Sequence, residues 1–158
     1  MKKADPAARA GLAFITGLRE VADHAHGLVV DVASPRLPGE LIRKVRRELR
    51  MPTLTALDRA VLVELAEGAT WEQVADALAL TVEETRARYE KTARMWSEGQ
   101  PVDRMNVALF GDHAVGLLHD QDPRGTAESL DAWWRRHAEP WDDVDDRPVT
   151  RLLDDTGS

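Results

Sequence analysis

The chain has 158 residues, 43% of them hydrophobic and 31% charged, which suits one soluble domain with a core or one small domain with appendages. It contains no cysteine, which excludes disulfides and thiolate metal sites and fits a reducing cytoplasm, and it has no apolar run long enough to span a membrane. The net charge of −7 arises in residues 103–158, with 6 basic and 13 acidic side chains, so this part would repel a nucleic acid unless it points away from it.

The first expected element is a helix that begins after Asp5, an N-cap residue followed by proline at the first helical position. The apolar patch at residues 12–18 is short and charge resumes directly after it, so we interpret this start as a capped helix and not as a signal peptide. Gly27 is expected to end the helix in a left-handed conformation.

The loop "ASPRLPGE" leads into a second expected helix from Glu40 to Arg50, which Pro52 should end. Its stretch "IRKVRRELR" is the only dense basic cluster of the chain. Because lysine and arginine neutralise phosphates, we expect this helix to contribute phosphate contacts through Arg43, Arg46 and Arg47.

Three helices with similar starts should follow, at Thr55–Glu67, Thr70–Ala79 and Thr81–Ser97. Each threonine is followed three residues later by a side chain that can complete a capping box, namely Asp58, Gln73 and Glu84. Gly68 is expected to close the first of the three helices.

The C-terminal part predicts one more helix, capped at Thr126 and running to Glu139, with Pro140 as its terminator. The acidic stretch 142–158 is expected to be loose. Tryptophan is frequent among interface anchors, so the C-terminal tryptophans are candidate protein-contact residues: Trp133, Trp134 and Trp141.

Two segments on either side of the central helices are similar to each other. "DHAHGLVVDVASPR" (23–36) matches "DHAVGLLHDQDPR" (112–124) with one gap. We therefore predict that residues 23–50 and 112–138 form similar units, a helix end, a loop and a helix, with Gly27 and Gly116 both at positive φ. The histidines in these segments are interpreted as helix-end residues, and no metal site is predicted.

The stretch 57–96 resembles the helix-turn-helix of sigma-factor region four and of LuxR-type response regulators. The resemblance covers about a quarter of the chain. It consists of a leucine-rich first helix, a glycine, a second helix with the pattern "E-x-x-A-x-x-L", a threonine cap and a third helix with basic residues. The matching positions are Leu57, Val61, Leu65, Gly68, Val74, Ala75, Leu78, Thr81, Arg86 and Arg88.

This resemblance implies that the third helix enters the major groove of DNA. The contacts expected from it are Arg86, Arg88, Lys91 and Arg94. The sequence departs from the family pattern at Ala79, where a turn glycine is usual, and at Thr85, where a β-branched aliphatic residue is usual. Glu83 and Glu84 also replace small polar residues, although a helix N-terminus explains both of them.

The sequence as a whole predicts an all-α cytoplasmic protein with a central helix-turn-helix flanked by two related helix-loop-helix arms. The expected parts are an N-terminal arm (1–52), the helix-turn-helix (53–98), a C-terminal arm (99–141) and an acidic flexible tail (142–158). The leading hypothesis is a homodimeric transcriptional regulator that binds double-stranded DNA. The alternative is a module that binds a protein partner in transcription through its acidic, tryptophan-bearing C-terminal arm. No motif points to an enzyme or a cofactor.

Overall fold

The computed structural model describes residues 5–32, 34–98, 122–139, 142 and 145–154. Within these ranges the regular structure is helical and contains no strand, as the sequence predicts. The helices are α1 (Pro6–Val32), α2 (Glu40–Glu48), α3 (Arg50–Ala66), α4 (Trp71–Leu78), α5 (Val82–Ser97), α8 (Pro123–His137) and α9 (Pro148–Asp154).

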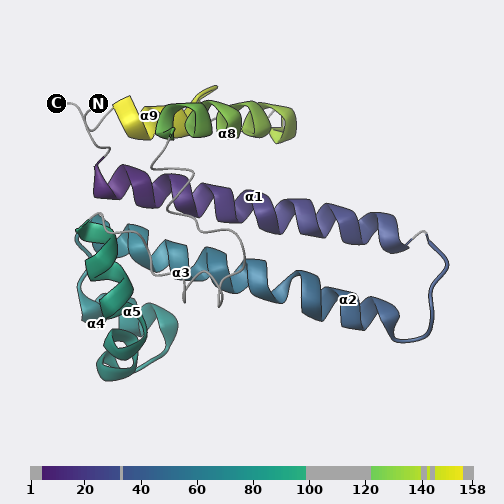
Figure 1. The fold of residues 1–158 in the computed structure, drawn as a ribbon, viewed down its shortest axis with the longest axis horizontal. Helices are drawn as coiled ribbons and strands as arrows, with labels where there is room; N and C mark the ends of the chain where they lie inside the picture. Colours follow the sequence, from purple (N-terminus) through teal and green to yellow (C-terminus); the bar gives the residue numbers. More distant parts are fainter. Residues whose placement is uncertain (1–4, 33, 99–121, 140–141, 143–144, 155–158) are drawn as a thin grey trace.

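The long helix α1 forms the middle layer of the molecule (Figure 1). The helices α2 and α3 run back along one side of α1, and α8 and α9 lie along the other side (Figure 1). The pair α4 and α5 packs at the end of α3 that is far from the α1–α2 loop (Figure 1). The predicted helix-turn-helix is thus attached to one end of a helical hairpin.

Small residues of α1 allow α3 to approach closely. Ala10 and Ala13 are buried together with Leu62 of α3 and Trp96 of α5. A Cβ atom at Gly17 would lie 2.9 Å from Arg59 Nη1 and 3.3 Å from the Cα of Ala56, so only glycine fits there without movement. The space is used by Arg59, which is buried and donates to the carbonyl oxygen of Ala13 at 3.1 Å.

A second core cluster joins the two ends of the chain. Leu12 of α1 is buried against Ala127 and Leu130 of α8 and Val149 of α9. Asp131 is also buried here, and it accepts hydrogen bonds from the backbone N–H groups of Val149 at 2.8 Å and of Thr150 at 3.1 Å. This carboxylate satisfies the free N–H groups at the start of α9.

The prediction that Gly27 ends the first helix is wrong, because α1 continues to Val32. Gly27 lies inside the helix and does not have positive φ. Contacts with α2 support the additional turn, since Asp31 forms an ion pair with Lys44 of α2 at 3.0 Å, and Leu28 is buried within this part of α1. Tertiary packing therefore overrides the local preference of glycine for a helix end.

The second and third helices also differ from their predicted limits. α2 ends at Glu48, four residues before Pro52, which lacks the N–H that would bond to the Glu48 carbonyl oxygen, and α3 begins at Arg50, so that Pro52 itself lies in the first turn of α3. Proline is tolerated there because the first N–H groups of a helix have no partner within it. Thr55 is consequently a buried residue within α3 and not a cap. The predicted domain boundary between residues 52 and 53 falls inside α3.

The C-terminal part contains more structure than the sequence suggested. The N-cap of α8 is Asp122, which accepts from the Gly125 N–H at 2.9 Å, so the predicted cap at Thr126 is wrong. Part of the stretch expected to be loose forms α9, and Val149 and Thr150 are buried. Its packing on α1 and α8 explains why this segment becomes helical.

The structure describes the first copy of the predicted repeat except residue 33, and only residues 122–138 of the second copy. In the first copy the expected helix end at Gly27 is absent. Residues 112–121 of the second copy, including Gly116, lie outside the described residues, as do the predicted terminator Pro140 and Trp141. The relation between the two segments stays a prediction from the sequence.

Candidate nucleic-acid interface

Both helices of the predicted helix-turn-helix begin with the capping boxes that the sequence predicts. The Thr70 side chain accepts from the Gln73 N–H at 3.3 Å, and the Gln73 side chain accepts from the Thr70 N–H at 2.8 Å. Thr81 and Glu84 make the same reciprocal pair at 3.2 and 2.9 Å. These bonds satisfy N–H groups that the first helical turns leave free, and so they fix where α4 and α5 start.

The turn between α4 and α5 is held by alanine in the left-handed region. Ala79 has φ 53° and ψ 42°, and its N–H donates to the carbonyl oxygen of Asp76. The Leu80 N–H donates to the carbonyl oxygen of Ala75 at 3.0 Å, which completes a Schellman motif. The turn therefore forms without the glycine that the resembling proteins usually have, at the cost of strain in Ala79.

The inner face of α5 is packed against α3 and α4. Tyr89 is buried with Val61 of α3 and Val74 of α4. Thr85 is fully buried, and its hydroxyl donates to the carbonyl oxygen of Thr81 at 2.9 Å. Threonine thus replaces a β-branched aliphatic residue without leaving a buried hydroxyl unpaired.

Arg86 lies beside α4. Its guanidinium group forms an ion pair with Glu90 at 3.0 Å and lies over the Trp71 ring, 5.3 Å from the ring centroid. The side chain of Arg86 remains partly exposed. A phosphate could reach it from outside the molecule, but it would compete with the carboxylate of Glu90.

Arg88 points to the opposite flank of α5. It forms an ion pair with Asp58 of α3 at 3.0 Å, and the Tyr89 hydroxyl donates to the same carboxylate oxygen at 2.8 Å. Burial and this hydrogen bond raise the pKa of the Tyr89 hydroxyl above its usual range. The sequence predicts Asp58 as a capping residue, whereas its partners lie 30 and 31 positions away and no local pattern could identify them.

The outward face of α5 carries the remaining predicted contacts. Lys91 and Arg94 are exposed, and so are Glu83 and Glu90. The hydrogen bonds that Glu84 accepts from the Thr81 N–H and hydroxyl lower the pKa of its carboxyl group. Glu84 is therefore an ionised cap, and the positive charge of this face lies towards the C-terminal half of α5.

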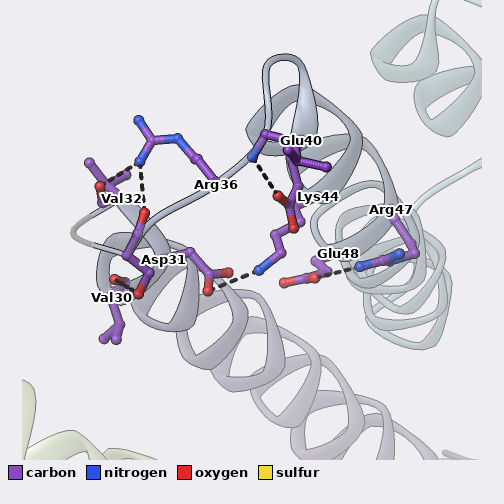
Figure 2. Close-up of polar contacts among 10 residues, drawn as sticks. Val30, Asp31, Val32, Arg36, Glu40, Lys44, Arg47 and Glu48 are labelled. Atoms are coloured by element: carbon purple, nitrogen blue, oxygen red, sulfur yellow. Dashed lines mark hydrogen bonds and ion pairs between the residues drawn. The ribbon is translucent and has the colours of Figure 1, made fainter.

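The basic helix α2 lies at the other end of α3 (Figure 1). Arg43, Arg46 and Arg47 are exposed, and Arg47 pairs with the neighbouring Glu48 at 3.1 Å. Lys44 is directed to α1, where its hydrogen bond to Asp31 raises the pKa of its ammonium group (Figure 2). Three of the four basic side chains between residues 43 and 47 thus face solvent.

The tryptophans of α8 are half-buried. Trp133 stacks on His137, with ring centroids 4.7 Å apart. Trp134 is half-buried to a comparable extent. Among the residues that the structure describes, no three metal-ligating side chains gather at one place. None of the described helices is both long and apolar enough to cross a membrane.

The two basic regions thus come from separate ends of α3, one on α5 and one on α2. Of the predicted contacts on α5, Lys91 and Arg94 share its outward face, and Arg86 and Arg88 lie on its flanks, bound to carboxylates. Comparisons of the chain with family models, with curated proteins and with solved structures find no match.

Proposed function

We propose that the protein binds double-stranded DNA through α5 and acts as a transcriptional regulator. The observation that carries this proposal is the unit formed by α4, the Ala79 turn and α5, in which buried Thr85 and Tyr89 fix the inner face and Lys91 and Arg94 remain exposed outside. A helix presented in this way can enter a major groove, as the resemblance to sigma-factor and LuxR-type proteins implies.

The roles of the basic residues follow from their partners. Lys91 and Arg94 would contact phosphates or bases directly. Arg86 would exchange Glu90 for a phosphate at the edge of the groove. Arg88 holds α5 on α3 through Asp58 and contributes to DNA binding mainly by positioning the helix.

A comparison of two double variants tests the proposal. Lys91→Ala/Arg94→Ala and the control Arg135→Ala/Arg136→Ala change the net charge equally, and the control residues are exposed on α8, across α1 from the proposed site. Binding to a fluorescent duplex of mixed sequence is measured at several salt concentrations. The α5 variant should lower the salt slope by about two, one for each phosphate that the variant no longer neutralises, and the control should leave it unchanged. Equal effects would mean that only net charge matters.

A second function, binding to a protein partner, is supported by the electrostatics of α5. Arg86 and Arg88 are both bound to carboxylates of the same chain. Glu83 is exposed in the first turn of α5, where a DNA-binding helix comes close to phosphates and a carboxylate would repel them. The half-buried Trp133 and Trp134 of α8 would then anchor the partner. Wild-type protein that binds no duplex even at low salt would favour this function.

A further inference from the structure

One side of α1 presents an apolar stripe to solvent. Its members alternate in spacing by four and three residues, and all of them are exposed: Leu18, Ala22, Ala25, Val29 and Val32. The exposed fraction is 45% for Leu18, 70% for Val29 and 53% for Val32. We call these five residues the α1 stripe.

The spacing of the α1 stripe is that of a coiled-coil seam. Apolar residues repeating every 3.5 positions stay on one side of a helix, here over about 21 Å, and they pack against a second helix in that arrangement. The stripe is not the face that holds α1 in the fold. In the same part of the helix, Leu28 is buried and Asp31 binds Lys44 of α2.

The neighbouring helix α2 has a matching apolar edge. Ile42 and Val45 are 67% and 41% exposed, and residues three positions apart lie on the same side of a helix. The hydrogen bond between Lys44 and Asp31 fixes α2 beside the end of α1 (Figure 2). The tip of the hairpin therefore offers two apolar edges on two neighbouring helices.

The charges around these two apolar edges indicate which molecule packs on them. Residues 19–32 of α1 carry one basic and three acidic side chains, a net charge of −2. Residues 36–50, which include α2, carry six basic and two acidic side chains, a net charge of +4. A second copy of the chain presents the same pair of surfaces, so α1 of one copy and α2 of the other are complementary in both charge and apolar character.

We propose that two copies of the chain associate through the tips of their α1–α2 hairpins, with the α1 stripe of each copy packed on Ile42 and Val45 of the other. The alternative pairing, α1 on α1 and α2 on α2, would bring like charges together. The interface buries Val29 and Val32 and leaves the outward face of α5 free. It requires no nucleic acid, so its test is independent of the proposed DNA binding.

Two adjacent valines provide a matched test. Val29 belongs to the α1 stripe, whereas Val30, with 59% exposure, is turned by about 100° from it on the same helix. Sedimentation velocity without DNA, from about 1 to about 100 µM chain, should show a dimer for the wild type. Val29→Glu should weaken dimerisation at least tenfold, because it buries a carboxylate in an apolar seam, and Val30→Glu should not. A monomeric wild type, or equal effects of both variants while helicity is kept, would overturn the proposal.

The pairing of helices can be tested with single cysteines, since the natural chain has none. Val29→Cys and Val45→Cys proteins are mixed and oxidised gently, and only disulfides between copies can form. The proposed arrangement should give mainly the mixed disulfide between positions 29 and 45. A product dominated by the disulfide between two copies of Val29→Cys would show that α1 packs on α1 and would overturn the proposed pairing.

Discussion

Arg88 donates a hydrogen bond to the Asp58 carboxylate at 3.0 Å and so connects α5 to α3. Tyr89 donates to the same oxygen from a buried position. We expect Asp58→Ala to lower the free energy of unfolding by about 1–3 kcal/mol, because the Tyr89 hydroxyl loses its acceptor. Arg88→Ala should lower it by no more than about 1 kcal/mol, because its guanidinium group is exposed. Urea unfolding measures both values, and equal losses would contradict this assignment.

The same hydroxyl should make the stability depend on pH in the alkaline range. Burial and the bond to Asp58 raise the pKa of Tyr89 in the folded protein, so unfolding at high pH releases a proton. The contribution of the protonated Tyr89 hydroxyl to stability is complete below the pKa of tyrosine in the unfolded chain, about 10, and it decreases as the pH rises above that value. Tyr89→Phe should therefore flatten the fall in stability above about pH 10, as measured by urea unfolding at a series of pH values. An unchanged slope would place the titrating group elsewhere.

Ala79 and Gly68 offer opposite tests of the left-handed conformation at helix ends. Ala79→Gly should stabilise the protein by about 0.5–1 kcal/mol, because glycine adopts φ 53° without the strain of a Cβ atom. Gly68→Ala should destabilise it by about 1 kcal/mol or more, because φ is 100° there. Thermal unfolding of the two variants is the measurement, and a loss of stability in Ala79→Gly would refute the argument.

Replacing two glycines of α1 by alanine should change the stability of the protein in opposite directions. At Gly17 an added Cβ atom would lie 3.3 Å from the backbone of Ala56, so Gly17→Ala should cost about 1–3 kcal/mol by pushing α1 and α3 apart. At Gly27 no atom lies within 4 Å and the residue is helical, so Gly27→Ala should stabilise by about 0.5–1 kcal/mol. Chemical unfolding compares them, with Gly27→Ala as the control for helix propensity.

We expect the hydrogen bonds that the Asp131 carboxylate accepts to keep α9 packed on α1 and α8. It accepts from both Val149 and Thr150 in a buried setting, so Asp131→Ala leaves two backbone N–H groups without their partner. We expect a loss of at least about 2 kcal/mol in stability, together with faster tryptic cleavage after Arg151, which lies within α9. Glu128→Ala, an exposed residue on the same helix, serves as the control. Unchanged cleavage rates in Asp131→Ala would mean that apolar contacts alone hold α9.

The parts of the fold that the sequence predicted best are those decided within one helical turn. Thr70 and Gln73, or Thr81 and Glu84, are three positions apart, and their reciprocal hydrogen bonds form wherever the rest of the chain lies. The closure at Gly68 is confirmed for the same reason, since its N–H bonds back to Leu65. Local signals therefore located α4, α5 and the end of α3.

The predictions that failed depend on partners far away in the sequence. Gly27 remains helical because α2 packs beside the last turns of α1. The segment 148–154, part of the stretch expected to be loose, becomes α9 because it packs on Leu12 and bonds to Asp131. At the candidate site, the sequence predicts that Arg88 contacts DNA. It gives no sign of the ion pair with Asp58, because Asp58 lies 30 positions earlier and outside any local pattern. A pattern within a helix indicates which side chains are basic, but not which of them are already bound.

The core cluster of Leu12, Leu130 and Val149 has a consequence for protein synthesis. Its first member emerges from the ribosome long before its last, and translation at about 5–20 residues per second separates them by about 7–27 s. During that interval α1 can pack on α3, but its other side has no native partner. The nascent chain therefore exposes the apolar side of α1 around Leu12 until Val149 has been synthesised, and aggregation or chaperone binding can compete with folding during that interval.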